Sequence, residues 1–168
     1  MLEAYIFTVC SFLMSAQTVP VKPEQRATCA QVVTKAVASN SDPGLIASIA
    51  WHESRFIPSR VSSVGAVGPM QIIPKYWCPD GSVEKCDLIA AGIRAFYTYL
   101  DKSGLEGALC RYSTGKPCKR TKAGRAYARK VLATHDAMID ALYQTWHDRM
   151  VEEQCLRCPH CCTASLSE

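Results

Sequence analysis

An apolar segment that ends in one acidic residue constrains the fold of this chain more than any other feature. The segment, LIASIAW at positions 45–51, is followed two residues later by Glu53. Asp42 lies before it as a plausible N-cap, so the pattern predicts a helix. Ile46, Ile49 and Glu53 are spaced to share one helical face. We therefore expect a carboxyl group that lies among buried apolar side chains.

Burial of Glu53 would disfavour its charged form and raise its pKa. A general acid that works near neutral pH needs such a pKa. The plainer interpretation is a solvated residue that merely ends the apolar stripe. The following residues favour the catalytic interpretation, because residues 62–69 are small and turn-forming and lead into Met70 and Gln71. A loop of small residues lets a bulky ligand approach the backbone, with the Gln71 amide available for hydrogen bonds.

Four short motifs carry a family resemblance. They are Glu53-Ser54 with Ser62, then GAVGPMQ at 65–71, ALCRYSTG at 108–115 and RAYARKV at 125–131. In this order and spacing they resemble the catalytic domain of soluble lytic transglycosylases, which is related to goose-type lysozyme. The resemblance covers residues 29–142. Pro69 stands where the family has Leu, and Ser113 where it has Asn, so the resemblance does not carry over one amide contact to the glycan.

The resemblance implies an all-α, lysozyme-like transglycosylase domain, which we place at residues 24–150. No strand-like alternation stands out, although a small β-hairpin near residues 59–67, beside the active site, would fit. The implied reaction cleaves the β-1,4 bond between N-acetylmuramic acid and N-acetylglucosamine and forms a 1,6-anhydro ring. Glu53 would be the only acid and base, and no metal or cofactor is expected.

The resemblance also assigns roles to other side chains. Ser62 would bond near Glu53 or the reacting sugar, Met70 and Gln71 would line the floor of a subsite, and Tyr112 and Tyr127 would orient Glu53. Ser113 would stand at the glycan contact. Both tyrosines have a plainer interpretation as core residues. Ser54 is expected to support the helix end, and His52, about 100° from Glu53 around the helix, to be structural.

Most glycosidases need two carboxylates that flank the bond. Here Asp42 lies at the far end of the same predicted helix, and the next acid after Glu53 is Asp80, beyond the whole loop. This spacing fits a mechanism with one carboxylate. Two other functions stay open, namely a lysozyme-type hydrolase of the same bond and a catalytically weak peptidoglycan-binding protein. The setting also stays open between wall turnover, a secretion or conjugation machine and a phage particle.

Length and charge set the remaining limits. A chain of 168 residues is long enough for one core, and its net charge is +4. Residues 116–130 contain seven Lys or Arg and no acid. Such a patch suits an anionic polymer, and a solvated helix start and loop is the equally plain alternative. Peptidoglycan is the expected partner and nucleic acid is ranked low, because no nucleic-acid-binding motif accompanies the patch.

The ten cysteines predict an oxidising compartment. We expect disulfides between Cys78 and Cys86 and between Cys110 and Cys118, because each interval contains Gly and Pro and can close a short loop. Pairing of Cys29 with Cys86 is the alternative that the resemblance suggests.

The two ends of the chain are expected to lie outside the domain. Residues 1–17 contain an apolar run of about the length of an export signal, too short for a stable membrane span. The expected location is the periplasm or cell wall, or a phage virion that acts on the host wall. The Cys-rich tail, residues 151–168, resembles half a zinc knuckle, but disulfides or intermolecular pairing are favoured over a metal.

Overall fold

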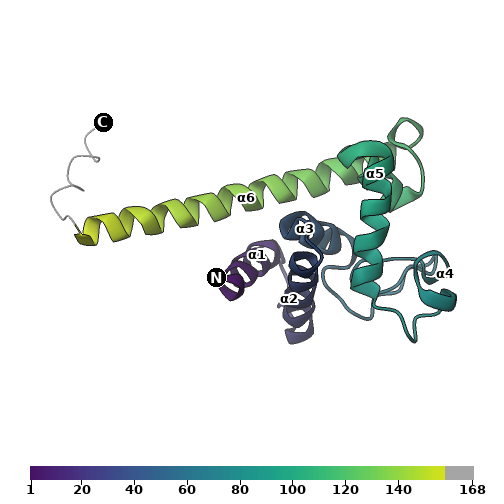
Figure 1. Ribbon diagram of the computed structural model, residues 1–168, viewed down its shortest axis with the longest axis horizontal. Helices are drawn as coiled ribbons and strands as arrows, with labels where there is room; N and C mark the ends of the chain where they lie inside the picture. The colour runs from purple at the N-terminus through teal and green to yellow at the C-terminus, as the bar shows by residue number, and fades with distance from the viewer. Residues whose placement is uncertain (158–168) are drawn as a thin grey trace.

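The computed structural model describes residues 1–157, and their architecture is all-α, as predicted (Figure 1). The α-helices are α1 (Leu2–Ser15), α2 (Pro23–Ala38), α3 (Pro43–Ser54), α4 (Pro74–Trp77), α5 (Leu88–Thr114) and α6 (Lys122–Arg157). Two 3₁₀ turns, Pro79–Gly81 and Cys118–Arg120, complete the set. The fold class therefore follows from the helical periodicity of the apolar residues.

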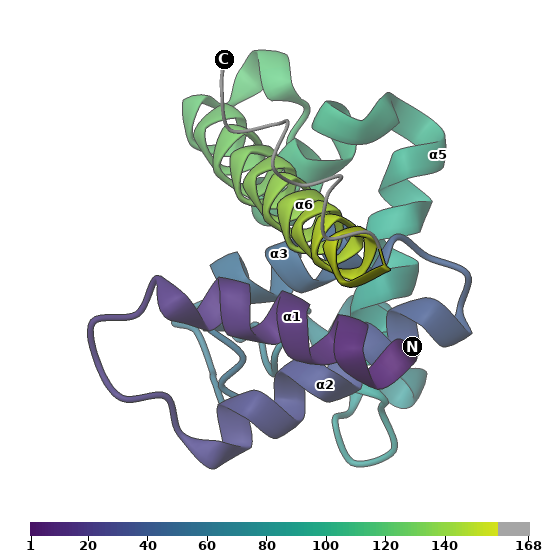
Figure 2. The ribbon, with the colours of Figure 1, turned by 90° about the vertical axis from the view of Figure 1, so that its left-hand side faces the viewer.

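Helix α3 lies at the centre of the fold and packs against α1, α2 and α6 (Figures 1 and 2). Ile46, Ile49 and Ala50 are fully buried, and Trp51 is 4% exposed. This surrounding packing explains why the segment is apolar on every side, since a helix covered all round needs no polar face. The acid at its end is thus carried by the best-packed helix of the described chain.

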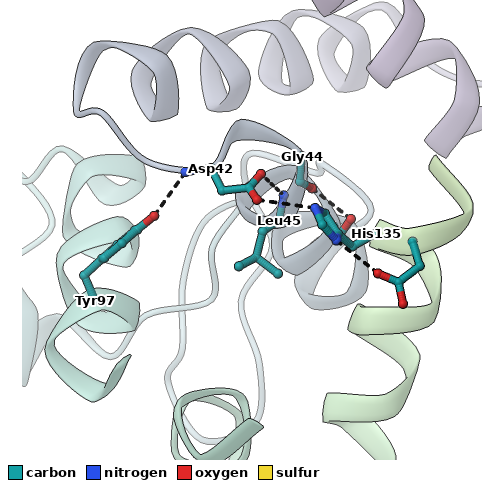
Figure 3. A network of polar contacts seen from close by, with 7 residues as sticks. Asp42, Gly44, Leu45, Tyr97 and His135 are labelled. Carbon is teal, nitrogen blue, oxygen red and sulfur yellow. Dashed lines mark hydrogen bonds and ion pairs between the residues drawn. The ribbon is translucent and has the colours of Figure 1, made fainter. Parts of the chain in front are cut away.

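Polar contacts hold the other end of α3 in place (Figure 3). The Asp42 carboxylate accepts a 2.9 Å hydrogen bond from the backbone N–H of Leu45, as an N-cap does. The backbone N–H of Asp42 donates to the Tyr97 hydroxyl on α5 at 3.0 Å. His135 on α6 places Nε2 at 3.4 Å from the Asp42 carboxylate. The start of α3 is therefore tied to both α5 and α6.

Helix α5 bends at Gly104. Gly104 has φ +66 and ψ 176, which is outside the helical region and costs glycine little. The segment before the bend packs against the loop after α3. The segment after it carries the ALCRYSTG motif and ends at Gly115, whose φ is +68. The bend thus lets one element supply two walls of the same site.

Only the first part of α6 is packed against the body, and its last turns extend away from it (Figure 1). Val131 and Met138 are fully buried, whereas Tyr143 is 57% and Trp146 59% exposed. The apolar residues of this helix therefore form a core face only as far as Leu142. The body ends there, and most side chains beyond Leu142 are exposed, although Trp146 borders a shallow groove beside Ala4 and Tyr5 of α1.

Helix α1 is part of the core. Val9 and Leu13 are 0% and 1% exposed, and Cys10 forms a disulfide with Cys29 of α2. The predicted pairs Cys78–Cys86 and Cys110–Cys118 are confirmed. The alternative pairing of Cys29 with Cys86 is wrong, because α1 brings Cys10 to Cys29. An export signal in residues 1–17 stays a proposal.

The expected β-hairpin is reduced to two isolated antiparallel bridges, Val61 with Val67 and Val67 with Ile72. The tail prediction falls mostly on residues 158–168, outside the described residues. Among the helices of residues 1–157, none is both long enough and apolar enough to cross a bilayer.

Candidate active site

A cavity of about 510 Å³ opens beside the end of α3 and contains most of the predicted site. Its walls come from the end of α3, the loop after it, α4 and both segments of α5. The lining residues are Glu53, Ser62, Val64, Ala66, Gln71, Ile72, Ile73, Tyr76, Trp77, Ala95, Tyr99, Arg111, Tyr112, Ser113, Thr114 and Gly115. Residues from position 53 to position 115 thus meet around one carboxyl group.

Glu53 lies in the last turn of α3, where the helix ends abruptly. Arg55 and Phe56 take left-handed backbone conformations, with φ of +57 and +58, and Phe56 is fully buried. A residue in the left-handed conformation commonly terminates a helix, although this backbone conformation is strained for residues larger than Asn. This turn directs the chain into the loop that forms the near wall of the cavity.

The electrostatics of Glu53 suit a general acid. Burial raises its pKa to about 7, against the smaller lowering effects of the Tyr127 hydroxyl and the Arg60 guanidinium. Its buried Oε1 has no partner at hydrogen-bond geometry among the described residues. Desolvation without compensating donors favours the protonated form. The side chain can therefore hold a proton near neutral pH.

Tyr127, on α6, lies close to Glu53 but does not line the cavity. Its hydroxyl is buried and is also without a partner at full hydrogen-bond geometry in the described chain. It nonetheless lies close enough to lower the pKa of Glu53, while burial and the neighbouring carboxyl raise the pKa of Tyr127 well above its usual value. The hydroxyl of Tyr127 and the carboxyl of Glu53 are thus close to each other, but each can still form a further hydrogen bond.

Tyr112 connects α5 to the loop. Its hydroxyl donates a 2.7 Å hydrogen bond to the backbone carbonyl of Met70, and burial raises its pKa well above the usual value. The phenol therefore stays protonated and serves as a donor. Met70 precedes Gln71, so this bond fixes the backbone at the floor of the cavity.

Gln71 and Ser62 shape the loop as well as line the cavity. The Gln71 side-chain amide donates to the carbonyls of Arg60 and Gly68 at 3.0 and 2.9 Å. Ser62 Oγ accepts a 3.0 Å bond from the backbone N–H of Ala66. Each of these two side chains therefore forms hydrogen bonds that hold the loop in place. The Gln71 oxygen and the Ser62 hydroxyl proton make no further contact within the described chain.

Met70 lies elsewhere than expected. Its side chain is fully buried and is not among the residues that line the cavity. A Cβ at Gly92 of α5 would lie 2.4 Å from Met70 Cβ, so the two segments are in very close contact. Met70 thus supports the floor from below, and Gln71 forms its surface.

The other expected residues take local roles. Ser113 lines the cavity, but its hydroxyl bonds to the carbonyls of Leu109 and Cys110 within α5 at 3.1 and 3.3 Å. Ser54 donates to the Pro69 carbonyl at 2.8 Å, which supports the helix end as predicted. His52 Nε2 pairs with the Thr134 hydroxyl at 2.8 Å, and burial lowers its pKa to about 4. His52 is thus neutral and structural.

Sequence reasoning expected Tyr99 in the core or the groove wall, but it missed the α4 side of an aromatic wall and one cation, Arg111. Tyr76, Trp77 and Tyr99 line the cavity, with the rings of Trp77 and Tyr99 edge to face at 5.8 Å. The Arg94 guanidinium bonds to the Trp77 carbonyl at 3.1 Å and fixes α4 against α5. Arg111 also lines the cavity. Arg111 lies within the ALCRYSTG motif, but nothing in the sequence places Tyr76 and Trp77 of α4 in the same cavity as Glu53.

Comparison with known proteins gives one match. The family model described as "Transglycosylase SLT domain" matches residues 31–135, which run from the middle of α2 to the packed part of α6. No curated protein and no solved structure matches the chain.

Proposed function

The chain belongs to the transglycosylase SLT domain family, and on that premise we propose that it is a lytic transglycosylase with Glu53 as its sole acid and base. The family acts on peptidoglycan, which lies outside the cytoplasm. The proposed reaction cleaves the β-1,4 bond between N-acetylmuramic acid and N-acetylglucosamine and leaves a 1,6-anhydro end.

One observation carries this proposal: Glu53, with its pKa raised to about 7, is the only acid among the described residues that line the cavity. A hydrolase with two carboxylates needs a second one about 5–9.5 Å away to act as nucleophile or base. The described cavity offers none. A reaction in which the substrate supplies the second group fits this arrangement.

In the first step Glu53 donates its proton to the glycosidic oxygen as the bond to the muramic C1 breaks. The acetamide of the same sugar stabilises the positive charge at C1, as in other substrate-assisted glycosidases. Glu53 is then a carboxylate and accepts the proton of the C6 hydroxyl, whose oxygen closes on C1. The proton lost in the first step is regained, and no water is consumed.

The surroundings of Glu53 supply what both steps need. The buried site favours the neutral acid before the first step, and the Tyr127 hydroxyl and the Arg60 charge stabilise the carboxylate between the steps. A donor with a pKa near the working pH can both give and take the proton. The same carboxyl therefore suffices for both transfers.

The test uses purified peptidoglycan and mass spectrometry of the released sugars. Wild-type protein should release anhydro ends, and Glu53→Gln should release none while it keeps its helical circular-dichroism spectrum. Reducing ends would identify a hydrolase instead. Binding without release by the wild type would identify a glycan-binding protein, and activity retained by Glu53→Gln would refute the assignment of the acid.

The three disulfides among the described residues agree with a protein that works in an oxidising compartment outside the cytoplasm. An export signal and a role in a secretion or conjugation machine, in a phage particle or in wall turnover are further proposals. N-terminal sequencing of the protein recovered outside the cytoplasm would test the signal.

A further inference from the structure

Arg111 lies in the cavity, and within residues 1–157 no partner is seen for its buried Nε. Its guanidinium forms no ion pair within residues 1–157 either. A partly buried cation without a counter-charge is unfavourable, because burial removes hydration that nothing replaces. Such a group is therefore suited to bind an anionic ligand.

The charge of Arg111 is not used to tune the catalytic acid. Arg60, and not Arg111, is the cation that lowers the pKa of Glu53. Glu53 and Arg111 are the only charged residues in the described lining, and Glu53 holds its proton up to about pH 7. The cavity therefore presents a net positive charge to a ligand.

Arg111 also supplies charged hydrogen-bond donors, whereas several of the neutral donors around it are used within the fold. The Ser113 hydroxyl donates within α5, the Gln71 amide donates within the loop, and the Tyr112 hydroxyl donates to the Met70 carbonyl. A guanidinium offers five N–H donors in a planar fork that matches a carboxylate. Of the ligand chemistries that the position can take, a carboxylate therefore fits best.

We propose that Arg111 binds a carboxylate of the glycan substrate and so makes the cavity selective for muramic-acid-containing strands over neutral chitin-like strands. The inference rests on the proposed function, because it specifies the substrate of the same cavity. N-acetylmuramic acid bears a lactyl group that ends in a free carboxylate when no peptide is attached. When a stem peptide is attached, the peptide brings carboxylates of its own. An N-acetylglucosamine polymer has neither.

The experiment measures dissociation constants in a Glu53→Gln background, so that no ligand is cleaved. Three ligands are compared: a peptide-free muramic-acid-containing oligosaccharide, the same oligosaccharide with stem peptides, and an N-acetylglucosamine hexamer. Adding Arg111→Gln should weaken binding of at least one carboxylate ligand about tenfold or more and leave the hexamer unchanged. Arg111→Lys should recover only part of the loss, because it keeps the charge but not the fork.

The two carboxylate sources are distinguished by which ligand is affected. Loss on the peptide-free oligosaccharide indicates the lactyl carboxylate, and loss only on the peptide-bearing one indicates the stem peptide. Lys102→Gln is the matched control, since Lys102 is an exposed cation on the same helix and lies outside the cavity lining. It should leave all three constants unchanged.

Equal weakening of all three ligands by Arg111→Gln would overturn the inference and make Arg111 a structural residue. No change for any ligand would overturn it as well. Either result leaves the proposed function intact if the protein with Glu53 releases anhydro sugars. Conversely, selective binding without any release by that protein would refute the proposed function and keep Arg111 as a carboxylate-binding residue.

Discussion

The Tyr112 hydroxyl donates a 2.7 Å hydrogen bond to the backbone carbonyl of Met70, 42 residues earlier in the chain. This bond joins the second segment of α5 to the loop that follows α3. It holds Gln71 at the cavity surface and Met70 beneath it. The tyrosine of the third motif thus acts on the site through the backbone of the second motif.

Replacing Tyr112 with Phe should lower the free energy of unfolding by about 1–3 kcal/mol, because it leaves a buried carbonyl without a donor. The loop backbone at Met70 should also become less fixed and Gln71 less well positioned. The Michaelis constant for peptidoglycan should therefore rise more than the turnover number falls. Urea denaturation and steady-state kinetics measure the two effects. Tyr143→Phe, at a tyrosine 57% exposed on α6, is the control. A Tyr112→Phe protein as stable as the wild type would contradict the role given to this bond.

Activity should depend on pH through Glu53. The first step needs the protonated acid, so kcat/KM should fall as pH rises through about 7, the pKa of Glu53. Tyr127→Phe removes a hydroxyl that stabilises the carboxylate, so the pKa should rise and the basic limb should move to higher pH. Rates measured from pH 5 to 9 show the shift. A limb that stays in place, or moves to lower pH, would refute the contact between Tyr127 and Glu53.

Stability should depend on the same carboxyl group. Folding raises its pKa from 4.5 to about 7, so the folded protein holds this proton more tightly than the unfolded chain. The resulting stabilisation is complete below pH 4.5 and is lost as pH rises through about 7. Glu53→Gln should therefore be more stable than the wild type at pH 8, by up to about 3 kcal/mol at 1.36 kcal/mol per unit of pKa.

The comparison at low pH supplies the control for this prediction. At pH 5 the wild-type carboxyl is already neutral in the folded state, so most of the advantage of Glu53→Gln should disappear. Urea denaturation at both pH values measures the difference. An advantage of equal size at pH 5 and pH 8 would show that it does not come from a buried charge.

Removal of two different disulfides should lower stability in both cases but weaken ligand binding in only one. Cys110–Cys118 encloses the residues that line one end of the cavity, whereas Cys10–Cys29 joins α1 to α2 away from it. Replacing either pair with Ala should cost about 3 kcal/mol of stability, since both loops are short. Only loss of Cys110–Cys118 should also weaken binding to peptidoglycan at temperatures where both variants are folded. Pull-down with insoluble peptidoglycan, compared between the two double variants, measures this. Equal binding by both would show that this loop needs no tether.

Several features of the fold were predictable because they depend on local physics. The helical spacing of Ile46, Ile49 and Glu53 predicts both the helix and the burial of its acid, and α3 confirms both. The bend at Gly104 and the two short disulfide loops follow from glycine and from cysteine spacing. Each of these features needs only residues that are close in sequence.

Contacts between distant segments could not be read in the same way. The pairing of Cys10 with Cys29 depends on α1 packing against α2, and the position of Met70 depends on its contact with Gly92. Tyr76 and Trp77 line the same cavity as Glu53 because α4 is fixed to α5. In each case the residues on either side in the sequence do not indicate which distant segment packs against the side chain.

The sequence by itself determined the helices, the position of the acid within one of them and the family to which the chain belongs, because periodicity and motif spacing are local properties. Only the tertiary structure decided which groups surround that acid. The absence of a second carboxylate in the described cavity, the approach of Tyr127 and the unpartnered guanidinium of Arg111 arise where α3, α5 and α6 pack together. Desolvation and charge depend on such neighbours, and they set the chemistry of the site.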